Sequence, residues 1–90
     1  MLIALDYDGT YTADPLLWDG FLQSAKKAGH EIVCATMRHE HEGADVIESL
    51  PGILVVFTGR QAKRTFLAER GIFPTIWIDD NPAWIYQDSL

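Results

Sequence analysis

The sequence predicts an α/β protein in which four parallel strands form one sheet between two layers of helices. Four short apolar runs, at residues 2–5, 31–35, 53–57 and 75–78, do not alternate with polar residues, as is typical of strands buried on both faces. Stretches with helical spacing lie between them, and this alternation predicts right-handed parallel crossovers. The 90 residues, of which 48% are hydrophobic, suffice for one core. We therefore expect a single domain over residues 1–90, a Rossmann-like three-layer α/β/α sandwich.

Three helices are expected between these strands. The first spans roughly residues 15–28, because Asp14-Pro15 is typical of an N-cap followed by proline at the first helical position, and Gly29 can end it. The second covers about 40–50 and ends before Pro51-Gly52, and the third covers about 60–70. Residues 81–90 can hold only a helical turn packed through Trp84 and Ile85. The side chains expected to face the core are Leu17, Phe21, Ala25, Ala28, Val46, Ile47, Leu50, Ala62, Phe66 and Leu67.

Composition narrows the class of protein. The formal net charge of −6 disfavours nucleic acid as a partner, because proteins that bind nucleic acid usually present a basic face. Cys34 is the only cysteine, which excludes a disulfide within the chain and fits a reducing compartment. The N-terminus lacks the pattern of a secretory signal, and no run reaches membrane-spanning length. We expect a soluble, cytoplasmic protein that does not associate with membranes.

Polar residues follow each of the four expected strands. They are Asp6 and Asp8, then Thr36 and Arg38, then Thr58-Gly59-Arg60, and finally Asp79-Asp80. In an open parallel sheet, ligands bind beyond the carboxyl ends of the strands, so these residues should meet at one site. Asp6 and Asp8 share a face if the strand geometry continues through Tyr7. Two carboxylates held that close would repel each other unless a cation compensates them, which indicates a metal site.

At this point the sequence resembles the haloacid dehalogenase-like (HAD) phosphohydrolases. Asp6-Tyr7-Asp8-Gly9-Thr10 matches the first motif of that family, Asp-x-Asp-Gly-Thr after a hydrophobic strand. Thr36, Lys63 and the Asp79-Asp80 pair resemble the second, third and fourth motifs, so the resemblance covers about residues 2–82. It implies a strand order of 4-1-2-3 and a Mg²⁺-dependent phosphatase that acts through an aspartyl-phosphate.

The resemblance also implies a role for each motif residue. Asp6 would be the nucleophile. Asp8 would be the general acid and base, and its backbone carbonyl would help to hold Mg²⁺. Thr36 would bind a phosphoryl oxygen. Asp79 and Asp80 would complete the metal site, with Asp79 the more direct ligand and Asp80 bound through water or orienting the cluster.

One cation near the start of a helix should neutralise the transferring phosphoryl group. The spacing of Lys63 ahead of the last acidic pair resembles the family's order of lysine, helix, short strand and acidic motif, and this resemblance favours Lys63, while Arg60 and Arg64 remain alternatives. The candidate substrate-binding residues are Gly9, Thr10, Arg38 and Arg60. Arg38 fits a solvated loop equally well.

Each motif taken alone also has a simpler interpretation. A lone Asp-x-Asp pair, a threonine at a strand end and Asp-Asp-Asn-Pro are all common in turns. His39 and His41 are expected at a solvated helix start rather than at a metal. Trp18, Trp77 and Trp84 are expected to pack in the core or at its rim. The position of the motifs in one ordered series is what favours the functional interpretation.

Members of the resembled family usually carry a cap domain, and this chain has no room for one. The site should therefore be open, and open sites commonly accept bulky substrates or are closed by another subunit. The expected partner is a phosphorylated substrate, small or bulky. A binding or regulatory module with the same fold and little activity is the alternative. A phosphoacceptor domain similar to response-regulator receivers is disfavoured, because receivers place the acidic pair and the phosphorylated aspartate on successive strands.

Overall fold

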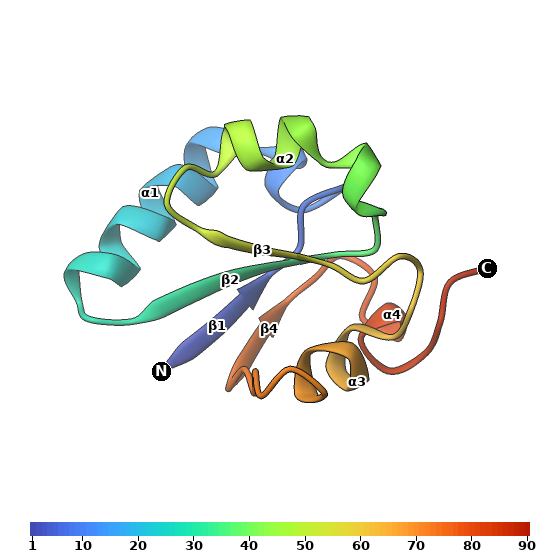
Figure 1. The fold of residues 1–90 in the computed structure, drawn as a ribbon. Helices are drawn as coiled ribbons and strands as arrows, with labels where there is room; N and C mark the ends of the chain where they lie inside the picture. The colour runs from blue at the N-terminus through green and yellow to red at the C-terminus, as the bar shows by residue number, and fades with distance from the viewer.

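The computed structural model describes all of residues 1–90 and contains one sheet of four parallel strands. The strands are β1 (Leu2–Leu5), β2 (Glu31–Thr36), β3 (Leu54–Phe57) and β4 (Ile76–Ile78). Their order is β3-β2-β1-β4, which is 4-1-2-3 read from the other edge of the sheet (Figure 1). Every neighbouring pair is parallel. All four strands therefore direct their carboxyl ends to the same edge.

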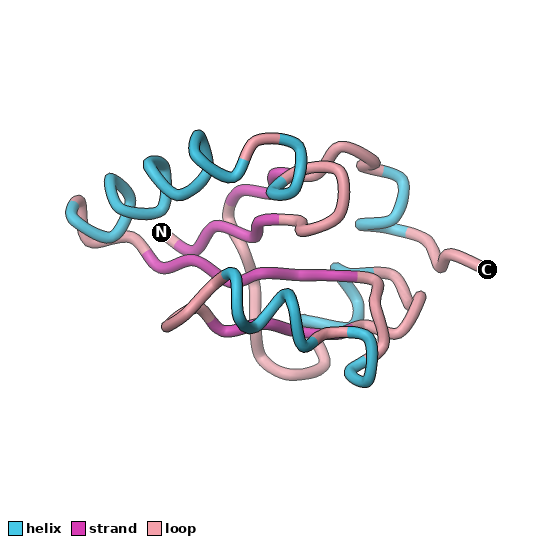
Figure 2. The backbone as a smooth tube through the Cα atoms, turned by 90° about the horizontal axis from the view of Figure 1, so that it is seen from above, coloured by secondary structure: helices cyan, strands magenta, loops and turns pink.

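Helices cover both faces of this sheet. α1 (Pro15–Lys27) and α2 (Ala44–Ser49) lie on one face, and α3 (Lys63–Ala68) and α4 (Ala83–Tyr86) lie on the other (Figure 1). Two short 3₁₀ turns, η1 (Tyr11–Ala13) and η2 (Glu40–Glu42), precede α1 and α2. The two termini lie at opposite ends of the molecule, with the C-terminus beyond the strand ends (Figure 2). The α/β sandwich predicted from the sequence is confirmed.

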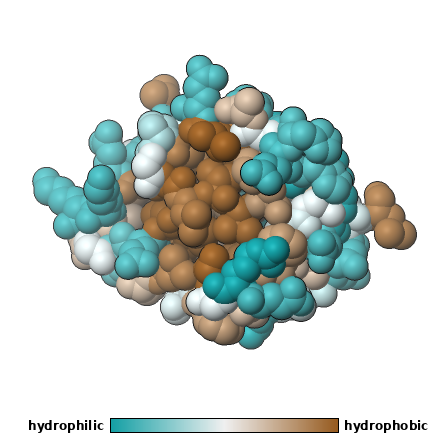
Figure 3. Space-filling model, in the orientation of Figure 1, coloured by the Kyte–Doolittle hydropathy of each residue, from teal (hydrophilic) through white to brown (hydrophobic).

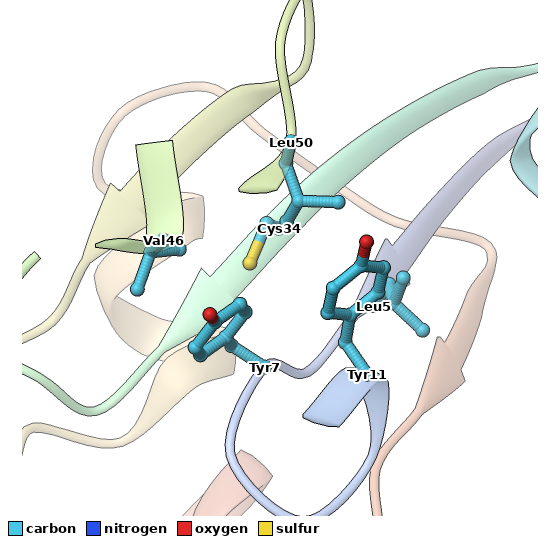
Figure 4. Close-up of a cluster of buried hydrophobic side chains, with 6 residues drawn as sticks. All are labelled: Leu5, Tyr7, Tyr11, Cys34, Val46 and Leu50. Carbon is cyan, nitrogen blue, oxygen red and sulfur yellow. The ribbon is translucent and has the colours of Figure 1, made fainter. Parts of the chain in front are cut away.

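The core has one cluster on each face of the sheet. Under α1 and α2, Figure 4 shows the first cluster, in which the rings of Tyr7 and Tyr11 stack with centroids 5.6 Å apart. Its buried members are Leu5, Tyr7, Tyr11, Cys34, Val46 and Leu50. The second cluster, on the face that α3 covers, comprises Ala4, Val33, Ala35, Val56 and Leu67. Consecutive residues of β1 and β2 thus belong to opposite clusters, which explains their uninterrupted apolar runs. Burial also raises the pKa of Cys34 to about 12, so this thiol stays neutral.

Two of the expected helices were placed wrongly. The second is divided at Gly43, whose φ of −110° and ψ of 7° are not helical, into η2 followed by α2. A Cβ at Gly43 would lie 2.1 Å from the ring of Phe57, so this position requires glycine. The third begins at Lys63 rather than at residue 60, because Arg60 has a φ of 72°. That left-handed conformation belongs to a turn and cannot continue into a helix.

Some side chains expected in the core face solvent instead. Leu17 is 58% exposed and Ile47 is 56% exposed, while Trp18 and Leu22 of α1 pack against the first cluster. Leu54 of the edge strand β3 is 59% exposed, and apolar side chains gather in this part of the surface (Figure 3). No helix combines the length and the apolar character needed to cross a membrane.

Candidate active site

A buried ion-pair network lies where the strands end. The ammonium group of Lys63 donates hydrogen bonds to Asp6 Oδ1 at 2.7 Å and to Asp79 Oδ2 at 2.6 Å. The three side chains are 1%, 9% and 3% exposed, respectively. Asp6 follows β1, Asp79 follows β4, and Lys63 is the first residue of α3. Buried charges persist in proteins when they are paired in this way, so the fold holds these three groups together.

Three carboxylates meet beside this ammonium group. Asp6, Asp79 and Asp80 each offer one oxygen, and these oxygens lie within 4.8 Å of one another. The hydroxyl of Thr10 lies 3.1 Å from Asp6 Oδ2 and 3.0 Å from Asp80 Oδ1, and it accepts the backbone N–H of Asp80. Carboxylate oxygens are the ligands that hard cations such as Mg²⁺ prefer. The donor set therefore fits Mg²⁺, which Asp6, Asp79 and Asp80 would hold.

The protonation of this cluster is also consistent with a cation site. Burial raises the pKa of Asp6 to about 7, although the neighbouring Lys63 opposes that shift. The hydrogen bond with Asp6 holds the pKa of Asp80 below its usual range. Without a cation, the raised pKa means that Asp6 holds a proton more readily than a free aspartate does. A divalent ion would replace that proton, because metal ligands bind in their deprotonated form.

Gly9 allows Asp80 to approach the first motif. The φ of Gly9 is +83°, in the left-handed region that favours glycine, and a Cβ there would lie 2.5 Å from Asp80 Oδ2. Any other residue would displace this carboxylate. In the structure, Gly9 and Thr10 thus position Asp6 and Asp80, whereas the sequence placed both residues among the candidate substrate contacts.

Asp8 is held by Arg38 rather than by the acidic cluster. The guanidinium donates to both oxygens of Asp8, at 2.9 Å from Nε and 2.8 Å from Nη2. It also donates to Asp45 Oδ1 at 2.6 Å and to the carbonyl of Glu42 at 2.8 Å. The hydrogen bonds with Asp8 raise the pKa of Arg38 above its already high value. Arg38 is therefore an ordered part of the site and not a free loop residue.

A cavity of about 150 Å³ opens between these groups. Its lining residues come from the ends of β1, β2 and β3 and from the C-terminal segment: Asp6, Asp8, Thr36, Met37, Arg38, Arg60, Trp84 and Ser89. Since a water molecule occupies about 30 Å³ in the liquid, the cavity has room for roughly one phosphoryl group. A larger hollow of about 450 Å³ lies at the opposite end of the sheet, around the first residues of β2 and β3. That hollow contains none of the strand-end residues.

The remaining candidates are placed as follows. Thr36 is 1% exposed, and its hydroxyl accepts the backbone N–H of Arg38 at 3.3 Å. Arg60 donates to the carbonyl of Met37 at 2.6 Å and lies 3.4 Å from the Glu42 carboxylate. Arg64 lies outside the cavity, with its guanidinium 5.8 Å from the ring centroid of Tyr86. Among the three candidate cations, the one that contacts the carboxylates of the acidic cluster is Lys63.

The two histidines do not join the carboxylate cluster. The rings of His39 and His41 stack on each other with centroids 5.5 Å apart, and both residues are exposed. The backbone N–H of His39 donates to Glu42 at 2.8 Å, at the start of η2. This is the solvated helix start expected from the sequence.

Sequence reasoning missed the contribution of the C-terminal segment to the cavity. Trp84 and Ser89 line it, and two hydrogen bonds hold this segment near α3: the N–H of Ser89 donates to the carbonyl of Arg60 at 2.8 Å, and the N–H of Ala62 donates to Asp88 at 2.7 Å. No local pattern marks these residues, because the contacts exist only after the chain has folded back. The only signal is the Asn81-Pro82 turn, which redirects the chain after β4.

Comparisons with known proteins found no match among family models, curated proteins or solved structures.

Proposed function

We propose that this chain is a Mg²⁺-dependent phosphohydrolase that forms an aspartyl-phosphate on Asp6, similar in chemistry to the HAD phosphohydrolases that its motifs resemble. The observation that carries the proposal is the buried contact of Lys63 with Asp6 and Asp79. This contact lies next to the carboxylate of Asp80 and next to a cavity that has room for a phosphoryl group. A structural ion pair alone would not need an adjoining cavity lined by two arginines.

In the first step, a carboxylate oxygen of Asp6 attacks phosphorus, and the bond between phosphorus and the ester oxygen breaks. The leaving oxygen takes a proton from Asp8. Thr36 and Arg60, which line the cavity, bind phosphoryl oxygens, while Lys63 holds the carboxylate of Asp6 in place. Bound Mg²⁺ would supply positive charge that offsets the negative charge of the carboxylates and the phosphoryl group.

In the second step, Asp8 takes a proton from water, and the water oxygen attacks phosphorus. The acyl-phosphate bond breaks, so inorganic phosphate leaves and the carboxylate of Asp6 is restored. Both oxygens of Asp8 accept hydrogen bonds from Arg38 in the free protein. Acid and base catalysis by Asp8 therefore requires Arg38 to release at least one of them. A phosphoryl group in the cavity offers the guanidinium other oxygens to bind.

The test compares the wild-type protein with Asp6→Asn in the presence of Mg²⁺ and a chromogenic phosphate ester. Asp19→Asn serves as a matched control, because Asp19 lies in α1 and its carboxylate accepts a hydrogen bond from Tyr11, outside the cavity. We expect turnover by the wild type and the control and none by Asp6→Asn. Acid quenching followed by mass spectrometry should find the phosphoryl group on Asp6 during turnover. Equal rates for the wild type and Asp6→Asn would remove Asp6 from the mechanism.

The double hydrogen bond between Arg38 and Asp8 also favours a second candidate, a binding or regulatory module with little turnover. In such a protein the general acid would stay engaged and the site would only bind Mg²⁺ and a phosphorylated partner. Calorimetric Mg²⁺ binding without hydrolysis of any ester in a broad panel would favour the module. Rapid turnover of one ester would eliminate it.

A further inference from the structure

The C-terminal segment contributes Trp84 and Ser89 to the lining of the cavity. α4 follows β4 and lies beyond the strand ends (Figure 1). Ile85 anchors it, being 5% exposed, while the neighbouring Trp84 lines the cavity and remains 38% exposed. A tryptophan that is held on a fixed turn and still open to solvent presents a large rigid surface to anything that enters the cavity.

The small size of the cavity decides what this surface would contact. At about 150 Å³, it is smaller than the 300–1,000 Å³ typical of pockets that enclose a whole small molecule. It can enclose the phosphoryl end of an ester, and the group bonded to the ester oxygen must lie at the mouth. Trp84 and Met37 provide the apolar part of the lining. The group beside the ester oxygen would therefore lie against these two side chains.

The charged residues of the lining leave little attraction for a second anionic group. Arg38 is bound by the carboxylates of Asp8 and Asp45, and Arg60 lies beside Glu42. The chain as a whole carries a net charge of −6, which repels polyanions at long range. An uncharged planar group suits the mouth better.

We propose that Trp84 is a specificity-determining residue that selects phosphate monoesters of aromatic alcohols, by stacking its indole on the ring next to the ester oxygen. This inference rests on the proposed function. An aliphatic group of equal size would also cover Trp84, but it would lack the additional attraction between aromatic rings.

The test measures kcat/KM for phenyl phosphate and for cyclohexyl phosphate and takes their ratio in each variant. Dividing the wild-type ratio by that of Trp84→Ala cancels the different intrinsic reactivities of the two esters. We expect a quotient of about 3 to 10, from the usual strength of an aromatic pair. Trp84→Phe should restore most of the preference. Trp84→Leu keeps an apolar side chain without a ring and should behave like Trp84→Ala, which guards against a loss of folding in the smaller variant.

Tyr86→Ala is the matched control, because Tyr86 is another exposed aromatic residue of α4 that does not line this cavity. Its ratio should equal that of the wild type. A quotient near 1 for both Trp84→Ala and Trp84→Leu would overturn the inference while leaving the phosphatase proposal intact.

A binding measurement separates the inference from the proposed function. Phenylphosphonate and methylphosphonate cannot be hydrolysed at an ester bond, and their affinities for the wild type and Trp84→Ala can be measured with Mg²⁺ by calorimetry. If no ester is turned over but phenylphosphonate binds more tightly than methylphosphonate only when Trp84 is present, the phosphatase proposal fails and the role of Trp84 stands. If there is neither turnover nor a Trp84-dependent preference, both fail.

Discussion

Replacing Lys63 with methionine should remove a large part of the stability of this protein at neutral pH. The ammonium is 1% exposed and lies 2.6–2.7 Å from two carboxylate oxygens. At an effective dielectric constant of about 20, each contact contributes roughly 6 kcal/mol of Coulomb energy before the cost of desolvation. After that cost, deleting one partner of a buried pair typically lowers the free energy of unfolding by about 3–5 kcal/mol. A chain of this length has a total of roughly 5–14 kcal/mol, so the loss would be about a fifth of that total or more.

Urea unfolding followed by circular dichroism would measure this loss without added metal. Lys27→Met is the matched control, because Lys27 is an exposed lysine at the end of α1, and its effect should stay within about 0.5 kcal/mol. The deficit of Lys63→Met should be largest at pH 8 and should shrink at pH 5, because protonation of Asp6, whose pKa is raised to about 7, removes part of the uncompensated charge. A deficit below about 1 kcal/mol at pH 8, or an equal deficit at both pH values, would refute the reasoning.

The further predictions concern the metal site, the pH dependence of stability and α1. Mg²⁺ binding should weaken by up to about tenfold per pH unit below pH 7, because the pKa of Asp6 is raised to about 7 and its proton must leave first; an affinity that calorimetry finds constant from pH 5 to 8 would contradict this. The raised pKa of Asp6 also affects stability. Between about pH 4 and 7 the folded, metal-free protein holds a proton on Asp6 that the unfolded chain has released, so the free energy of unfolding should fall as the pH rises. Gly9→Ala should weaken Mg²⁺ binding at least tenfold, because the added Cβ would collide with Asp80. Gly20→Ala in α1 has open space around the added Cβ, and it should raise the free energy of unfolding by about 0.5–1 kcal/mol. Asp14→Ala should lower the free energy of unfolding by about 1 kcal/mol, because the carboxylate of Asp14 caps the N–H of Leu17. Urea unfolding measures this change, and an unchanged midpoint would show that the cap does not stabilise α1.

The fold could be predicted from local patterns because the apolar runs and the capping signals are local. The runs at β1 and β2 are buried on both faces, and Asp14-Pro15 begins α1 as expected. The motifs also pointed to the right edge of the sheet, because parallel strands send all their carboxyl ends to one side. The choice of Lys63 among three neighbouring cations followed from its spacing, and the structure places its ammonium on Asp6 and Asp79.

Other features depend on contacts between distant residues and could not be found in this way. The requirement for glycine at position 43 comes from the ring of Phe57, which lies 14 positions later in the sequence. The left-handed turn at Arg60 delays α3, although arginine has no intrinsic preference for that conformation. The bond between Asp8 and Arg38 joins residues 30 positions apart.

The inner position of β1 has a consequence for how the chain acquires this site. β1 pairs with β2 on one side and with β4 on the other, so Asp6 contacts an ammonium group 57 residues later in the chain, and that ammonium group also binds Asp79, which follows β4. During synthesis, a chain that stops short of β4 would carry a first strand paired on one side alone, and its acidic cluster would still lack Asp79 and Asp80. Such a domain folds as a unit, and here the acidic cluster is complete only when β4, the last strand, pairs with β1, the first.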